Sequence, residues 1–160
     1  MNIEQRNQLL SIVFGIIILV LGYFLYHAIV DPYEEVLERE QMTERVRHRM
    51  SNVRDALNQY KNRVGEGEFP PSDGGLDSLV QFLKTDSVML AQGDSLFSEL
   101  PPNTYDPDSI IYSPRPPHNR FEYALNDTLR PQIYLLEDPD SEDKIGSLEQ
   151  TTMLNAASWE

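Results

Sequence analysis

The sequence predicts an α+β protein: a single N-terminal transmembrane helix continues into a long amphipathic helix, which packs on a small antiparallel β-sheet with irregular Pro-rich loops. Three observations lead to this prediction. An uncharged apolar run occupies Leu9–Val30, and apolar side chains recur at helical spacing between residues 33 and 64. Residues 65–160 hold every proline except Pro32, together with short alternating segments that are typical of strands.

The apolar run is long enough to cross a membrane. Leu9–Val30 carries no charged residue, and as a helix it would be about 33 Å long, against a hydrocarbon core of about 30 Å. A cleaved signal peptide is the rival interpretation, but its apolar part is usually only about 7–15 residues and precedes a small-residue cleavage site. The run here ends in Tyr26-His27-Ala28-Ile29-Val30 without such a site, so an uncleaved anchor is favoured.

The flanks of this run predict its orientation. Arg6 and the amino terminus precede it, and Asp31 and Glu34 follow it. Because positive charge tends to stay in the cytoplasm, residues 1–8 are expected there, and the bulk of the chain after residue 30 is expected on the other side of the membrane.

Charge divides the remaining chain. Residues 1–64 hold eight basic and eight acidic side chains, whereas residues 65–160 hold five and 18, which accounts for the whole net charge of −13. Such a chain is repelled by phosphate backbones, so nucleic acid is not an expected partner. The predicted organisation is a cytoplasmic segment 1–8, a transmembrane helix 9–30, a helical stalk 31–64 and an acidic globular domain 65–160.

The stalk shows one apolar stripe. Its members advance by alternating steps of four and three residues, which places them on one helix face. The spacing suits a coiled coil with a partner or packing on the chain's own domain, and the short length favours the second. The stripe consists of Val46, Met50, Val53, Leu57, Tyr60 and Val64.

Beyond the stalk, the pattern changes to short elements. The helix is expected to stop at Gly65, and a second helix is expected over about 76–84. Residues 110–112, 120–125 and 132–136 have the composition of short strands, and residues 126–128 suit the turn between the last two.

The order of these features resembles a known family. The segments are Val53-Arg54-Asp55-Ala56-Leu57-Asn58-Gln59-Tyr60, Gly67-Glu68-Phe69-Pro70-Pro71, Gly75-Leu76-Asp77-Ser78-Leu79-Val80, Phe121-Glu122-Tyr123 and Ser158-Trp159. Together they resemble the major pseudopilin of bacterial type II secretion systems, within the type IV pilin superfamily. The resemblance implies a structural, non-enzymatic component of a secretion or type IV pilus-like machine.

One family feature is not found in the sequence. Pseudopilin precursors carry a leader ending in Gly, followed by Phe-Thr-Leu and a Glu, and neither Gly15 nor Gly22 has such a successor. The expectation is therefore a pseudopilin-like periplasmic domain on an unprocessed anchor. The alternative is a single-pass accessory or assembly-platform subunit of a membrane complex, with a helical stalk and an adaptor domain.

An acidic loop supplies the one candidate site. Residues 137–143 hold five carboxylates, and Ca²⁺ prefers six to eight oxygen ligands. The resemblance points to the same loop, because major pseudopilins hold calcium there. The expected ligands are Asp138, Asp140, Glu142 and Asp143, and the alternative is a solvated acidic loop.

No catalytic site is expected. The sequence lacks Cys, a G-x-S-x-G motif, a phosphate-binding Gly loop and H-E-x-x-H, and its three His are widely separated. The expected partners are the membrane, other proteins of the machine and further copies of the chain. Apart from calcium, no cofactor is expected.

Overall fold

The computed structural model describes residues 3–160 of the chain. The first two residues of the predicted segment 1–8 therefore lie outside the described residues. The chain divides into two compact units, one ending at Gln41 and the other comprising Met42–Glu160. This division falls inside the predicted stalk 31–64, so residues 42–64 belong to the globular unit.

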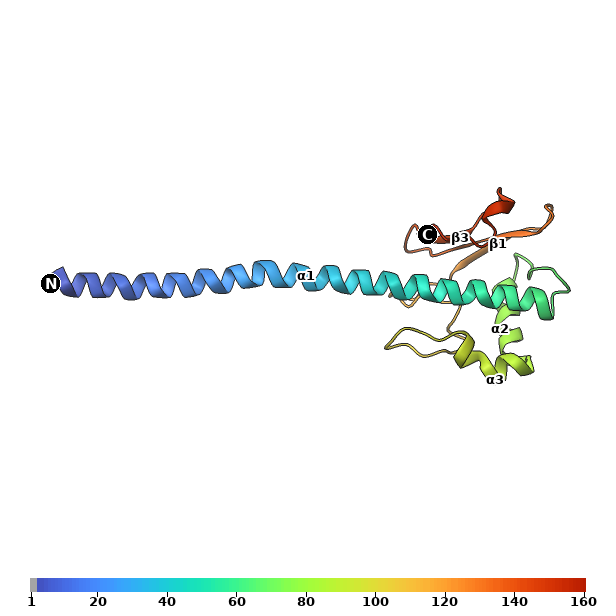
Figure 1. The fold of residues 1–160 in the computed structure, drawn as a ribbon, viewed down its shortest axis with the longest axis horizontal. Coiled ribbons are helices and arrows are strands. Elements are labelled where there is room, and N and C mark those ends of the chain that lie inside the picture. The colour runs from blue at the N-terminus through green and yellow to red at the C-terminus, as the bar shows by residue number, and fades with distance from the viewer. Residues whose placement is uncertain (1–2) are drawn as a thin grey trace. The chain divides into compact units, whose positions relative to one another are not determined.

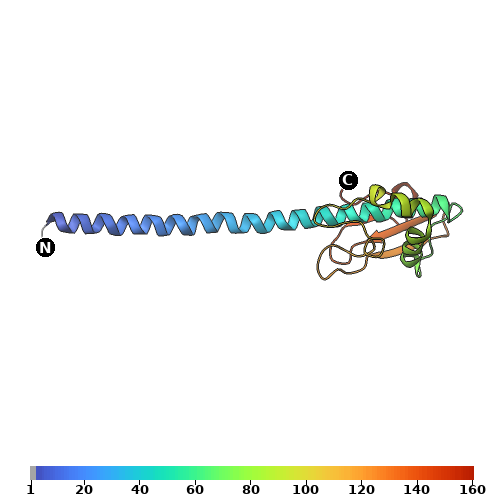
Figure 2. The same ribbon diagram turned by 90° about the horizontal axis from the view of Figure 1, so that it is seen from below.

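Helix α1 spans Ile3–Arg63 and so contributes to both units (Figures 1 and 2). It continues through Pro32, as the sequence allowed. Lys61 and Arg63 lie in its last turn, where cations favour the negative end of the helix dipole. The helix ends before Gly65, where a side chain would collide with the carbonyl oxygen of Glu68.

Two short helices follow in the globular unit. Helix α2 (Gly75–Thr85) coincides closely with the predicted second helix and buries Leu76, Leu79 and Leu83. Helix α3 (Ser87–Leu96) was not predicted, because its buried positions are few and show no clear helical period. It begins at Asp86, whose carboxylate accepts hydrogen bonds from the backbone N–H groups of Val88 and Met89.

Three antiparallel strands in the order β1-β2-β3 form the sheet. Strand β1 is Glu122–Asn126, β2 is Ile133–Glu137 and β3 is Lys144–Gly146. The register pairs Leu125 with Tyr134 and Leu136 with Ile145. These side chains share the face that points into the core, so the molecule is an α+β protein, as predicted.

One predicted strand is wrong, and one strand of the sheet was not predicted. Residues 110–112 form no strand: Ile110 and Ile111 are buried, but Tyr112 makes only an isolated bridge to Arg120. Residues 110–112 are therefore a core segment that makes few strand-type hydrogen bonds. Strand β3 was missed because it is only three residues long and only Ile145 in it is buried.

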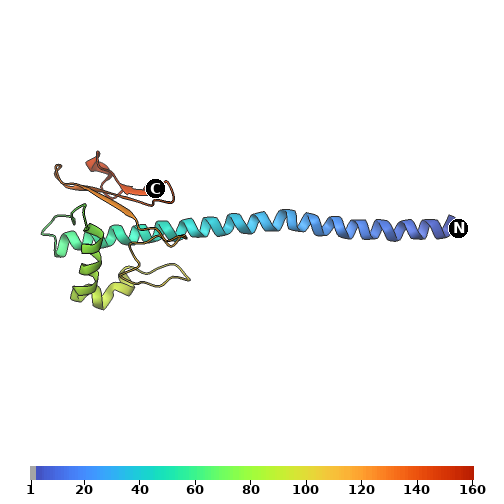
Figure 3. The same cartoon turned by 180° about the vertical axis from the view of Figure 1, so that it is seen from behind.

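The core lies between α1 and the elements on either side of it. Within the globular unit, the sheet covers one side of α1 and helices α2 and α3 cover the other (Figures 1 and 3). Side chains from all of these elements join one apolar cluster, which includes Met50, Leu57, Leu79, Tyr134 and Ile145. The C-terminal segment adds Ala157, which bridges to Ile145.

A 3₁₀ turn (η1, Thr151–Met153) interrupts this C-terminal segment. The segment then returns along the outer edge of β3. Gly146 donates to the carbonyl of Ala156, and Ser158 donates to the carbonyl of Lys144. Gly146 has a φ of 86°, and a Cβ there would collide with the carbonyl oxygen of Tyr134, so only glycine fits.

Candidate functional site

The apolar run 9–30 is exposed to its surroundings along the first unit of the chain. Its most apolar 18-residue window has a mean hydropathy of 2.6, and none of that window is buried. The large apolar side chains of Ile18, Leu19 and Phe24 are 68%, 75% and 64% exposed. Among the described residues this is the one helix long and apolar enough to cross a membrane.

The predicted apolar stripe of α1, in contrast to the run 9–30, lies mostly in the core of the globular unit. Val46, Met50, Val53 and Leu57 are completely buried in the globular unit. Tyr60 is partly buried, and its ring packs edge-on against Phe82 of α2. Val64 follows the end of the helix and is 52% exposed. The first four positions therefore belong to the core of the chain's own domain.

A buried ion pair lies on α1 beside this stripe. The guanidinium of Arg49 donates to Glu99, at 3.1 Å between Nε and Oε1, and their side chains are 8% and 3% exposed. Arg49 also donates to the carbonyl of Tyr112, and Asn52 donates to the carbonyl of Ser98. Oε2 of Glu99 has no hydrogen-bond partner. The pair ties α1 to the segments that follow α3.

A second arginine of α1 reaches the acidic loop. Arg47 donates to both carboxylate oxygens of Asp143 at 2.9–3.1 Å. Its guanidinium also lies 5.3 Å from the ring centre of Trp159, which is within the range of a cation–π contact. One side chain therefore joins α1, the acidic loop and the C-terminus. The sequence around Arg47 gives no sign of these partners, because only the tertiary structure brings them to it.

The four predicted calcium ligands have separate surroundings. Asp138 is buried, and its Oδ2 accepts from Ser141 and lies 3.5 Å from Nη1 of Arg115. The carboxylate of Asp140 accepts two hydrogen bonds from the amide of Asn119. Asp143 binds Arg47, as described above, and Glu142 is exposed.

The contacts of these four carboxylates affect whether they could bind a cation. Arg115 and Arg47 already supply positive charge to Asp138 and Asp143. Among residues 3–160 no group of three or more His, Cys, Asp or Glu side chains is arranged to hold a metal ion. Oδ1 of Asp138, however, is buried and has no hydrogen-bond partner. The loop thus offers one unsatisfied ligand oxygen but does not gather the four carboxylates, and calcium binding stays a prediction.

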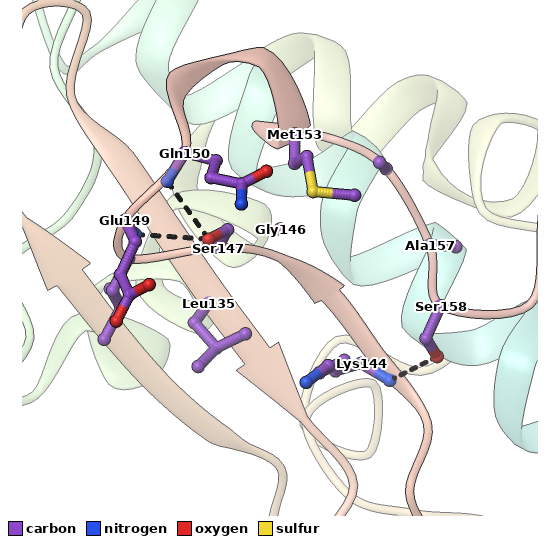
Figure 4. Close-up of a pocket in the computed structure, with 11 residues that line it drawn as sticks. Leu135, Lys144, Gly146, Ser147, Glu149, Gln150, Met153, Ala157 and Ser158 are labelled. Atoms are coloured by element: carbon purple, nitrogen blue, oxygen red, sulfur yellow. Dashed lines mark hydrogen bonds between the residues drawn. The ribbon is translucent and has the colours of Figure 1, made fainter.

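A shallow groove of about 550 Å³ lies beside the C-terminal segment (Figure 4). Leu135 and Gly146 of the sheet line it, with Met153 of η1 above them. Lys144 and Ser158 lie at one end, joined by a hydrogen bond from the Lys144 backbone to the Ser158 hydroxyl. The Ser147 and Ser158 hydroxyls in the lining accept backbone hydrogen bonds, Ser147 from Glu149 and Gln150 and Ser158 from Lys144.

Three tyrosine side chains have raised pKa values because of their surroundings. Burial, together with the nearby Asp94 and Asp106, raises the pKa of Tyr105 to about 12. Burial also raises the pKa of Tyr123 and of Tyr134 well above the usual range. The hydroxyls of the last two donate to Pro70 and Asn155, whereas the hydroxyl of Tyr105 has no partner. All three are packing residues of the core or its border.

Comparison of this chain with protein-family models, with curated proteins and with solved structures finds no match in any of the three.

Proposed function

We propose that this chain is a membrane-anchored, pseudopilin-like structural component of a bacterial type II secretion or type IV pilus-like envelope machine. It acts through protein–protein contacts and catalyses no reaction. Residues 9–30 hold it in the inner membrane, residues 1–8 lie in the cytoplasm and the acidic domain lies in the periplasm.

One observation carries the proposal: α1 exposes apolar side chains in its first part and buries apolar side chains in its second part. Within the first unit, α1 exposes its apolar side chains over more than the length of a membrane core. Within the second, the same helix buries Val46, Met50, Val53 and Leu57 against a small antiparallel sheet and two short helices. A helix that is both anchor and core element is the plan expected for a pseudopilin-like protein.

The motif order described above adds support, because its segments fall on the end of α1, in the loop that follows it, on α2, at the start of β1 and at the C-terminus. These are the elements that build the apolar core.

Membrane topology can be tested directly, because the chain has no cysteine. Asn7→Cys and Ser95→Cys place single thiols at two exposed positions, one before the apolar run and one on α3. In cells with a permeabilised outer membrane, an impermeant maleimide should label Ser95→Cys and leave Asn7→Cys unlabelled until the inner membrane is opened. The reverse pattern would overturn the orientation, and extraction of the protein by alkali would overturn the anchor.

A second experiment tests which proteins the chain assembles with. Full-length protein is crosslinked in native membranes and captured, and its partners and its own N-terminus are identified by mass spectrometry. Secretion components, higher oligomers and a trimmed, N-methylated terminus would support a working pseudopilin. An intact Met1 in a complex of fixed stoichiometry would instead support an accessory subunit.

A further inference from the structure

The part of α1 that follows the apolar run carries apolar side chains outside the expected membrane. Val36 and Leu37 are 52% and 40% exposed. At about 1.5 Å per residue, they lie roughly 9 and 10.5 Å beyond Val30. The headgroup layer on each side of a bilayer is only about 5–8 Å deep. If residues 9–30 span the membrane, lipid does not reach these two side chains.

These residues belong to one face of the helix. Tyr33, Leu37 and Glu40 are spaced by four and three residues, so they lie in one row, and Val36 borders it. Tyr33 is 67% exposed, and Glu40 is also exposed. We call the set Tyr33, Val36, Leu37 and Glu40 the juxtamembrane face. Glu38 lies on the opposite side of the helix.

The juxtamembrane face is set in a strongly acidic segment. Residues 31–41 contain five carboxylates and one arginine, a net charge of 1 − 5 = −4. The arginine, Arg39, forms an ion pair with Glu35 at 3.7 Å on the side away from this face. An apolar row that ends on a carboxylate is complementary to an apolar helix that carries a cation at the matching depth.

The same charges argue against a second copy as the occupant. Two parallel copies in register would place Glu40 against Glu40 within a segment of net charge −4, which is repulsive. A displaced copy would need a cation opposite Glu40. Apart from Arg39, which lies away from this face, the nearest cation within helix α1 is Arg45, so a displaced copy would have to shift by about five residues and lose the match between the two apolar rows.

We infer that the juxtamembrane face docks the helix of a different single-pass membrane protein, whose segment just outside the bilayer is apolar and carries Lys or Arg. This inference rests on the membrane anchoring in the proposed function. The alternatives, a second copy of the chain or no protein at all, are outcomes of the test.

The test uses the full-length chain in native membranes. Leu37→Cys places a single thiol on the juxtamembrane face, and Glu38→Cys places one at nearly the same depth on the opposite side. Each is labelled with a benzophenone maleimide and irradiated. We expect Leu37→Cys to give a protein adduct in about tenfold higher yield than Glu38→Cys, and the crosslinked segment of the partner to contain Lys or Arg.

Charge reversal then tests the recognition itself. In the Leu37→Cys background, Glu40→Lys should lower the adduct yield about tenfold, which corresponds to about 1.4 kcal/mol. Glu35→Lys, on the far side, is the matched control and should leave the yield within about twofold. Changing the partner's cation to Glu should restore the adduct with Glu40→Lys.

Four results would overturn the inference: equal yields from Leu37→Cys and Glu38→Cys, adducts with lipid alone, a partner segment without basic residues, or a disulfide-linked homodimer of Leu37→Cys on oxidation. Alkali extraction separates this failure from failure of the proposed function. A chain that resists extraction but shows no face-specific adduct retains its anchor and loses only the docking face. A chain that is extracted loses both.

Discussion

Arg47 and Asp143 form a bidentate ion pair across 96 positions of sequence, with hydrogen bonds of 2.9–3.1 Å. The carboxylate side chain is 9% exposed and the arginine side chain 40%. The same guanidinium contacts the ring of Trp159. One residue of α1 therefore holds both the acidic loop and the C-terminal segment against the helix.

Removal of this contact should weaken the domain. Arg47→Ala leaves Asp143 mostly buried without its cation, so we expect the free energy of unfolding of the full chain in detergent to fall by about 1–3 kcal/mol, as measured by urea denaturation. Arg47→Lys should recover only part of the loss, because Lys cannot make the planar two-bonded contact. The control is Arg39→Ala, at a pair that is more than 70% exposed on both sides. Equal effects at the two positions would contradict a special role for Arg47.

Truncation of the buried stripe should be more costly. Leu57 is fully buried, so Leu57→Ala should lower the free energy of unfolding by about 2–5 kcal/mol. Val64→Ala, at a position that is 52% exposed, should change it by less than about 0.5 kcal/mol. Thermal and urea unfolding of the full chain would measure both. An unchanged stability for Leu57→Ala would instead mean that the stripe serves a partner.

The effects of substituting Arg49 and Glu99, which form a buried pair, should be non-additive. Arg49→Met leaves Glu99 buried without its cation, and we expect a loss of about 3–5 kcal/mol. The double variant Arg49→Met with Glu99→Met removes both charges and should cost clearly less than the single one. A double-mutant cycle by urea unfolding measures the coupling. Simple additivity of the two changes would show that the pair contributes little.

Alkaline pH should destabilise the globular unit through its tyrosines. The pKa of Tyr105 is raised to about 12 from 10.0, and the pKa values of Tyr123 and Tyr134 are also raised. The unfolded chain therefore loses these protons first, so the associated stability is complete below about pH 10 and is lost as the pH rises through the folded-state values.

Stability measured as a function of pH, with tyrosinate absorbance, would check this loss. Tyr105→Phe should reduce the slope above pH 10 and leave stability at neutral pH equal or about 1 kcal/mol higher, because the hydroxyl that it removes is buried without a partner. Tyr112→Phe, at an exposed ring, is the control. An identical alkaline slope for wild type and Tyr105→Phe would contradict the assignment.

Calcium binding by the acidic loop gives the last prediction. A cation that reaches the unpaired Oδ1 of Asp138 should raise the Tm of the full chain, by an amount equivalent to about 2.7 kcal/mol at a hundredfold excess over Kd. Asp138→Asn should abolish this shift, whereas Glu149→Gln, outside the loop, should preserve it. If millimolar calcium leaves the Tm unchanged, the prediction of a calcium site in this loop is wrong.

Local sequence patterns predicted most of the helices and strands of this protein. The apolar run, the helical spacing from Val46 to Leu57 and the alternation at Phe121, Tyr123 and Leu125 each depend on a few neighbouring residues, because helices and strands repeat over short distances. These signals predicted α1, α2 and two of the three strands. The resemblance to pseudopilins and the calcium loop are also sequence-based and stay predictions.

Tertiary structure alone decided the rest. The periodicity of α3 and β3 is too short to detect, and they are held by a cap at Asp86 and by pairing with β2. Arg47 and Arg49 look like members of a solvated helix face in the sequence, because their partners lie 96 and 50 positions away. Periodicity tells which face of a helix is apolar, but the partner of a charged side chain depends on which distant segments the fold brings beside it.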